Sequence, residues 1–218
     1  LTNSTQAPEA TGLLRSILAR QPDRSVVIVQ VGFSTNLARL LDSNPDAHSP
    51  LGGLKLVEEK VKLLSLMAGA FQPIGGKIHL EHNVVIDVHS ARVIAQRWPT
   101  PIVYSGYEIG IGIRYPAMRM LEDYNYVEHH PLAEAYRLYN PRLHDLPTWD
   151  LTSVLQAVRP NRGYFGLSPP GRVVIAHDGA TSFQGDPEGL HRYLIERPWQ
   201  VIRVRETLID LSSKPPHE

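Results

Sequence analysis

The chain alternates between short, nearly continuous apolar runs and stretches in which apolar residues recur at helical spacing. Residues 25–31 form such a run and are mostly β-branched, which is typical of a parallel strand buried on both faces. The segment 32–36 then supplies turn and helix-capping residues, and apolar side chains at 37, 38, 40 and 41 follow at helical spacing. This pattern predicts a unit of strand, turn and helix.

The same rhythm continues toward the middle of the chain. We expect a helix over 54–60, a strand over 63–69, a helix that begins at Asp87 or Ser90, and a strand over 102–104 after the prolines that end this helix. Alternating helices and buried strands predict an α/β fold with a doubly wound, mostly parallel open sheet. We interpret residues 1–218 as a single domain of this kind.

The second half of the chain is less regular. Residues 108–147 are rich in Tyr, His and Pro and contain one predicted helix, over 132–138, so we expect an excursion beside the sheet. A helix over 151–158 and a strand over 172–176 follow. The residues Asp-Pro-Glu at 186–188 combine a capping side chain with proline at a first helical position, and they predict another helix.

Composition narrows the classes of ligand. Lys plus Arg and Asp plus Glu are equal, at 22 each, so no overall field favours nucleic acid or an anionic membrane surface. The chain has no cysteine, which excludes disulfides, Cys-ligated zinc and thiol nucleophiles. No apolar run is long enough to span a bilayer. We therefore expect a small-molecule ligand and neither a nucleic acid nor a membrane as partner.

Three segments resemble motifs of one enzyme family. Residues 32–38 read G-F-S-T-N-L-A, residues 81–87 read E-H-N-V-V-I-D, and residues 149–152 read W-D-L-T. In the same order, they are similar to the G-P-L-T-N-L-A, E-F-N-x-x-x-D and H-D-P-L motifs of the nucleoside hydrolases, including the inosine-uridine preferring enzymes. Each motif alone is short, so the resemblance rests on their order and spacing. It implies the nucleoside-hydrolase fold and hydrolysis of the N-glycosidic bond of purine or pyrimidine ribonucleosides, as in nucleoside salvage.

The resemblance also implies roles for five residues. The main-chain carbonyl of Thr35 and the side chain of Asp150 match calcium ligands of the family, and Glu81 and Asn83 match residues that hold the ribose hydroxyls. Trp149 stands where the family has a His near the leaving base, and we expect it to stack on a purine. Calcium prefers six to eight oxygen ligands and would share the ribose diol with the protein. Carboxylates near the sugar also suit the positive charge that develops on the ribose ring.

The chain departs from the family in ways that bear on catalysis. It has no D-x-D-x-x-x-D-D motif, which in the family supplies most calcium carboxylates and the Asp that deprotonates the attacking water. Gly75 falls where the family often has an Asn that touches ribose. We therefore interpret the sequence as the C-terminal two thirds of the fold, with no assigned catalytic residue and no hydrolysis expected unless the missing segment is present.

Structural roles compete with each of these assignments. Thr35 and Asp150 are also good helix-capping or first-turn residues, and Glu81 with Asn83 could belong to a satisfied polar network in the core. The H-x-E-H sequence at 79–82 suggests zinc, but strand spacing would place its two histidines on opposite faces.

Other side chains near the predicted site have two interpretations each. His129 and His130 could supply a general acid from a mobile loop or could be solvated surface. Tyr104, Tyr107 and Tyr115 could line a base pocket or pack in the core.

Three functional hypotheses follow. The first is a calcium-dependent nucleoside N-ribohydrolase, expected in the cytoplasm as a homo-oligomer. The second is a non-catalytic ribose-binding or scaffold protein that keeps the fold. The third is an unrelated nucleotide-sugar enzyme with a similar sheet.

Overall fold

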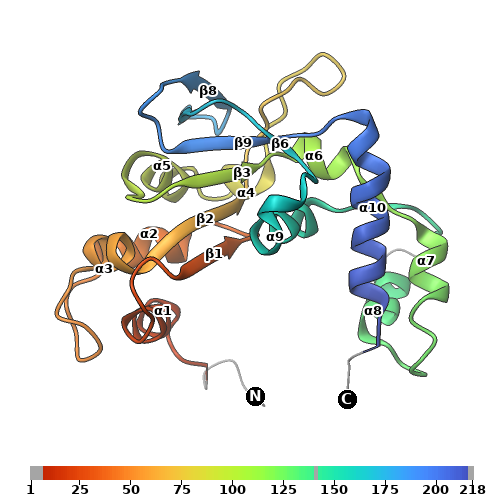
Figure 1. The fold of residues 1–218 in the computed structure, drawn as a ribbon, viewed down its shortest axis with the longest axis horizontal. Helices are drawn as coiled ribbons and strands as arrows, with labels where there is room; N and C mark the ends of the chain where they lie inside the picture. Colours follow the sequence, from red (N-terminus) through yellow and green to blue (C-terminus); the bar gives the residue numbers. More distant parts are fainter. Residues whose placement is uncertain (1–6, 140–141, 216–218) are drawn as a thin grey trace.

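A computed structural model describes residues 7–139 and 142–215 of the chain. Within this part, a seven-stranded sheet forms the centre of the molecule, in the order β1-β2-β3-β9-β7-β8, with β6 paired to β9 (Figure 1). Its strands are β1 (Val26–Gln30), β2 (Val61–Met67), β3 (Ile102–Ser105), β6 (Gly166–Leu167), β7 (Gly171–Ile175), β8 (Thr181–Gly185) and β9 (His191–Ile195). The two short strands β4 (Arg114–Tyr115) and β5 (Leu146–Pro147) pair separately.

Strand directions divide the sheet into two parts. Strands β1, β2, β3 and β9 run parallel to one another, whereas β6 and β7 pair with β9 in the antiparallel sense, and β7 and β8 form an antiparallel hairpin at the other edge. The parallel strands are joined through helices, as connections between parallel strands require. The prediction of an α/β, mostly parallel open sheet is therefore confirmed.

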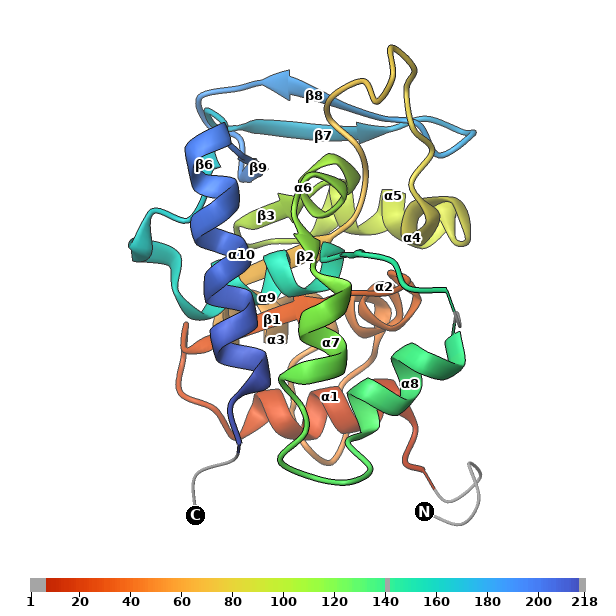
Figure 2. The same ribbon diagram turned by 90° about the vertical axis from the view of Figure 1, so that its right-hand side faces the viewer.

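Helices cover both faces of the sheet. Apolar residues of α1, α2, α3 and α5 pack with β1–β3 and β7 in one cluster, and residues of α6, α9 and α10 pack with β3 and β9 in a second. A third cluster joins α7, α8 and the end of α10, in the region predicted as an excursion (Figure 2). The helices are α1 (Ala10–Ala19), α2 (Thr35–Asp42), α3 (Gly53–Lys60), α4 (His82–Val85), α5 (Val88–Arg97), α6 (Tyr107–Gly112), α7 (Ala117–Glu122), α8 (Pro131–Tyr139), α9 (Trp149–Val158) and α10 (Pro198–Ser213).

The helix predicted at 186–188 is wrong. These residues form a turn between β8 and β9, in which the Asp186 carboxylate accepts a hydrogen bond from the main chain of Glu188 at 3.0 Å and pairs with Arg172. The Gly189 that follows lies so close to β7 that a Cβ atom would be 2.2 Å from the carbonyl oxygen of Gly171. Tertiary packing thus uses the capping side chain for a tight turn.

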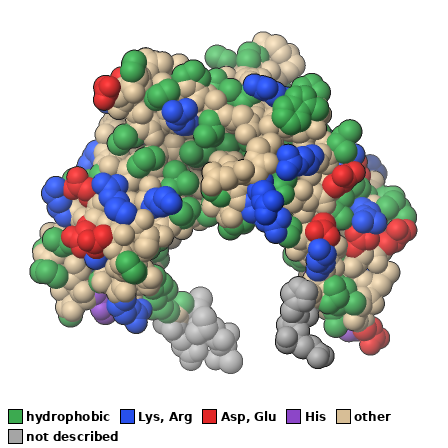
Figure 3. All heavy atoms as spheres, viewed as in Figure 1, with side chains coloured by type: hydrophobic (Ala, Val, Ile, Leu, Met, Phe, Trp, Pro, Cys, Tyr) green, Lys and Arg blue, Asp and Glu red, His purple; other side chains and the backbone are tan. Residues whose placement is uncertain are grey.

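The molecule is hollowed on the side of β1 and α9. The space-filling view shows an arch, with α1 in one wall and α7, α8 and α10 in the other (Figures 1 and 3). The expectation that the strand over 25–31 is central and buried on both faces is wrong: β1 lies at the edge of the sheet there, and its Val27 is 38% exposed. Among the described residues, no helix combines the length and the apolar character that a membrane crossing needs.

Candidate functional site

A pocket of about 290 Å³ opens where β2 ends, between α4, α6 and α9. We call it the carboxyl-edge pocket, because it lies at the carboxyl ends of parallel strands, where open α/β sheets commonly bind ligands. Its lining comes from several separate segments: Val31, Met67, Glu81, His82, Asn83, Tyr107, Trp149 and Asp150. Four of the five predicted site residues are in this set.

Glu81 is almost fully enclosed at one side of the pocket. It is 3% exposed and caps α4, and its carboxylate accepts main-chain hydrogen bonds from Asn83 at 2.8 Å, Gly69 at 3.1 Å and Val84 at 3.2 Å. Burial raises the pKa of Glu81, although these three hydrogen bonds act in the opposite direction. A carboxylate has about four acceptor positions. Glu81 thus ties α4 to the end of β2 and keeps about one position for a ligand.

Asn83 presents an oriented acceptor to the same pocket. Its side-chain amide donates to the carbonyl oxygen of Met67 at 3.1 Å and contacts the Met67 sulfur at 3.2 Å. Within the described residues, its side-chain carbonyl has no hydrogen-bond partner. The amide is therefore fixed by β2, and its free oxygen suits a hydroxyl donor.

Helix α9 brings the other two predicted residues to the pocket. The main-chain N–H of Thr148 donates to the carbonyl oxygens of Gly110 and Ile113 at 3.1 and 3.2 Å, which attaches the start of α9 to α6. The two helices are in such close contact here that a Cβ atom on Gly110 would lie 2.3 Å from Cδ1 of Trp149. The indole N–H of Trp149 also donates to the carbonyl oxygen of Tyr107 at 3.1 Å.

Small polar side chains allow α9 to lie close to the sheet. The hydroxyls of Ser65 and Ser153 are 2.9 Å apart, and those of Ser105 and Thr152 are 2.8 Å apart. All four residues are buried. These contacts between α9 and strands β2 and β3 fix the first turn of the helix, and with it Trp149 and Asp150, at the pocket.

Asp150 differs from Glu81 in having no partner. The residue is exposed at the rim, and its carboxylate makes no hydrogen bond or ion pair with any described residue. Neighbouring atoms still remove part of its hydration, and this desolvation raises its pKa. A partly desolvated carboxylate without a partner is available for a cation or a hydroxyl.

Thr35 lies outside the carboxyl-edge pocket. It lines an adjoining hollow of about 510 Å³, and the two cavities share Val31. The Thr35 hydroxyl donates to the carboxylate of Asp87, the N-cap of α5. Burial would raise the pKa of Asp87, but hydrogen bonds from Thr35 and Ser90 outweigh it and lower the pKa. The structure thus leaves Thr35 out of the carboxyl-edge pocket, in a hollow that shares only Val31 with it, and the Thr35 side chain makes a structural hydrogen bond.

An aromatic row leads from the pocket into the loop before α4. Tyr107 contacts Trp149, with ring centroids 5.2 Å apart, and the ring of His79 stacks on Tyr107 at 3.7 Å. The sequence gives no role to His79 in the pocket, because the H-x-E-H motif suggests only zinc binding and strand spacing argues against it. In the part of the chain that the structure describes, no group of three or more His, Cys, Asp or Glu residues could hold a metal ion. Periodicity could not have found this contact, because His79 lies in an irregular loop.

The other aromatic and histidine candidates lie elsewhere. Tyr104 is buried in the first core cluster and Tyr115 in the third, so of the three tyrosines only Tyr107 lines the pocket. The side chain of His129 is 80% exposed, between α7 and α8, and neither it nor His130 lines the pocket.

Comparison with known proteins identifies the fold. No protein-family model and no curated protein sequence matches the chain. Among solved structures, an inosine-guanosine nucleoside hydrolase superposes with a TM-score of 0.71 at 18% identity, over 98% of this chain and 70% of that one. For a plant nucleoside hydrolase the values are 0.68 and 19%, over 96% and 68%.

A third structure with this fold is described as a type III effector protein, XopQ, complexed with adenosine diphosphate ribose. It superposes with a TM-score of 0.59 at 16% identity, over 94% of this chain and 65% of that one. The resemblance predicted from three short motifs is therefore confirmed at the level of structure: this chain has the fold of the nucleoside hydrolases.

Proposed function

We propose that this chain forms the ribose-binding and base-binding part of a ribonucleoside N-ribohydrolase. The single observation that supports the proposal most is the convergence of Glu81, Asn83, Trp149 and Asp150 on one pocket, in a chain whose structural neighbours include nucleoside hydrolases. These residues are far apart in the sequence. A structural role for each one separately does not require them to meet.

The residues of the pocket suggest a division of tasks. The free carbonyl of Asn83 and the remaining acceptor position of Glu81 would accept hydrogen bonds from ribose hydroxyls. Trp149 and Tyr107 would form an apolar wall against the base. A substrate that lacks a ribose hydroxyl would leave buried polar groups of the pocket without a hydrogen-bond partner and would therefore react much more slowly. We thus expect selectivity for ribosides. The chain's own residues include no assigned general base.

The hydrolytic step needs carboxylates that this sequence lacks. The hollow along the open edge of β1 is lined in part by Thr35 and shares Val31 with the carboxyl-edge pocket. A further strand that pairs with β1 in parallel would end beside Val31. We therefore place the acidic segment of a complete site there, supplied by additional polypeptide.

The donor groups present do not form a calcium site on their own. Asp150 fits, because it is a desolvated carboxylate without a partner, but most of the acceptor capacity of Glu81 is taken by main-chain N–H groups. The described residues contain no group of three or more His, Cys, Asp or Glu side chains that could hold a metal ion, so the side chains of this chain supply few of the six to eight oxygens that calcium prefers. In a complete site, calcium would orient water and the ribose diol, with Asp150 and the Thr35 carbonyl as this chain's ligands.

A paired-substrate assay tests the proposal. The complete gene product should hydrolyse inosine, and 2′-deoxyinosine should react at least about 10²-fold more slowly because the site's polar groups would lose a hydroxyl partner. Asn83→Ala should remove most of this selectivity, whereas the surface variant Asp42→Asn should keep it. If neither nucleoside is hydrolysed, the protein is not a nucleoside hydrolase. If the two nucleosides are hydrolysed at equal rates, the proposed contacts with the ribose hydroxyls are wrong.

A second candidate is a non-catalytic protein that binds ribosyl compounds. The structural neighbour complexed with adenosine diphosphate ribose supports it. Calorimetry with inosine and adenosine diphosphate ribose distinguishes the two. Binding without turnover by the complete gene product would favour this candidate. Absence of calcium binding, nucleoside cleavage and riboside binding would instead favour an unrelated nucleotide-sugar enzyme.

A further inference from the structure

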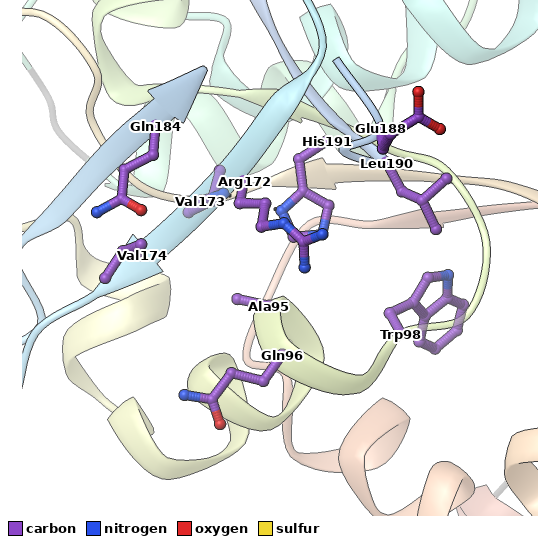
Figure 4. A pocket seen from close by; sticks show the side chains of 10 residues that line it. All are labelled: Ala95, Gln96, Trp98, Arg172, Val173, Val174, Gln184, Glu188, Leu190 and His191. Atoms are coloured by element: carbon purple, nitrogen blue, oxygen red, sulfur yellow. Dashed lines mark hydrogen bonds between the residues drawn. The ribbon is translucent and has the colours of Figure 1, made fainter. Parts of the chain in front are cut away.

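A second pocket, of about 380 Å³, lies at the opposite edge of the parallel strands. We call it the amino-edge pocket, because it is bounded by the start of β9, the β7–β8 hairpin and the end of α5 (Figure 4). It shares no lining residue with the carboxyl-edge pocket. Any ligand here would therefore be separate from the proposed nucleoside.

His191 offers a hydrogen-bond donor inside this pocket. The residue is 5% exposed, and its Nδ1 accepts a hydrogen bond from the main-chain N–H of Val173 at 2.9 Å, so the proton of the neutral ring is on Nε2. That N–H has no partner among the described residues, and the ring points into the pocket (Figure 4). Burial, with a smaller contribution from the positive charge of Arg172, lowers the pKa of His191 to about 4 and keeps the ring neutral.

Arg172 brings a positive charge to the same space. Its Nε donates to the Asp186 carboxylate at 2.6 Å, which orients the guanidinium, while its two terminal amino groups have no partner within the described residues. The figure shows the Glu188 carboxylate turned away from the pocket (Figure 4). Arg172 and His191 therefore form an oriented set of unused donors.

We propose that the amino-edge pocket binds a small organic monocarboxylate. A guanidinium presents paired donors that match a carboxylate, and the His191 N–H adds a third. Because Asp186 already neutralises part of the charge of Arg172, a monoanion suits the site better than a phosphate dianion. The volume exceeds that of an inorganic anion, and Leu190 and Val174, 46% and 41% exposed, offer apolar contact for the body of the ligand.

Matched probes can test this site by NMR. Benzoate should shift the imidazole signals of His191 and the amide signal of Val173, and it should raise the pKa of His191, because an adjacent anion stabilises the protonated ring. Benzamide, which has the same shape and no charge, should produce neither effect. Phenyl phosphate should bind more weakly than benzoate.

Two variants change the affinity in opposite directions. Arg172→Gln should weaken benzoate binding roughly 10- to 100-fold, because a charged hydrogen-bond partner is lost. Asp186→Asn should strengthen it, because Arg172 is then no longer neutralised, and Arg20→Gln at the C-cap of α1 should leave it unchanged. Equal shifts with benzamide, or unchanged benzoate affinity in both pocket variants, would overturn the proposal. Neither result depends on nucleoside hydrolysis.

Discussion

The two sides of the carboxyl-edge pocket use their carboxylates differently. On the α4 side, Glu81 is enclosed and accepts three main-chain hydrogen bonds, whereas on the α9 side Asp150 is exposed and has no partner among the described residues. The resemblance to the nucleoside hydrolases predicts a ligand-binding role for both. Glu81 therefore stabilises the fold as well as facing the pocket, whereas Asp150 makes no structural hydrogen bond among the described residues and is available only to a ligand.

The strongest test of this contrast is Glu81→Ala. The substitution leaves three buried or partly buried N–H groups without an acceptor, and we expect a loss of about 3–5 kcal/mol in the free energy of unfolding. Chemical denaturation measures this loss. Hydrogen exchange should increase first at Gly69, Asn83 and Val84, the three donors.

Glu9→Ala provides the matched control. Glu9 also caps a helix, but it is exposed and accepts one helix N–H, from Gly12 at 2.7 Å. Its loss should cost about 0.5–2 kcal/mol. If both variants lost the same stability, the hydrogen bond that joins α4 to the end of β2 would contribute nothing beyond capping, and Glu81 would stabilise the fold no more than an exposed helix cap does.

The second test concerns how α9 is seated. Gly110→Ala places a methyl group where Trp149 now lies, and such overpacking should cost about 1–3 kcal/mol. The displaced indole should change the fluorescence of Trp149, and riboside binding should weaken with it. In Gly185→Ala, the new Cβ meets no atom within 4 Å. An unchanged Trp149 environment in Gly110→Ala would mean that α9 is placed by the sheet alone.

Which features the sequence could predict follows from the range of the interactions involved. Strand β1 and helices α2, α5 and α9 were predicted because local periodicity and capping residues such as Asp87 determine them. The turn at Asp186 was not, because its cause is the distant Arg172 together with the close approach of Gly189 to β7. Local capping signals could not reveal either contact.

The candidate site shows the same limit. Motif order was sufficient to select Glu81, Asn83, Trp149 and Asp150, and the structure brings them to one pocket. The order of the motifs could not show that three main-chain N–H groups donate to Glu81, since one of these groups belongs to Gly69, which is twelve residues away. The number of free acceptor positions at a site is a tertiary property.

The third test concerns a carboxylate that, unlike the exposed Asp150, is partly buried although one of its oxygens lacks a hydrogen-bond partner in the described part of the chain. Glu196, directly after β9, has a buried carboxylate oxygen without a hydrogen-bond partner among the described residues. Burial together with the charge of Glu108 raises its pKa to about 7. Because this pKa is raised on folding, the protein should lose stability as the pH rises from about 4.5 to about 7. Glu196→Gln should therefore stabilise the protein above pH 7 by about 1–2 kcal/mol, after allowance for solvent screening.

Thermal melts at pH 5 and pH 8 measure this effect. The variant should melt roughly 2–6 °C higher than the wild type at pH 8, and the two should differ much less at pH 5. Glu188→Gln changes an exposed carboxylate in the turn before β9 and should alter neither melt. If Glu196→Gln raised the melting temperature equally at both pH values, the stabilisation would come from packing and not from removal of the carboxylate charge.

The smallest stability effect belongs to Asp150→Asn, and it decides the comparison. Desolvation raises the pKa of Asp150, so the ionised carboxylate slightly destabilises the folded protein at neutral pH. Replacing it with the neutral amide should therefore leave the free energy of unfolding unchanged or raise it slightly, by no more than roughly 0.5 kcal/mol. Under the proposed function, calcium affinity and nucleoside turnover of the complete gene product should nevertheless fall, because the proposed carboxylate ligand is lost. Calorimetry with calcium and thermal melts of the same preparation report both quantities. A clear loss of stability with unchanged calcium affinity would assign Asp150 to the fold and leave the pocket without a free carboxylate.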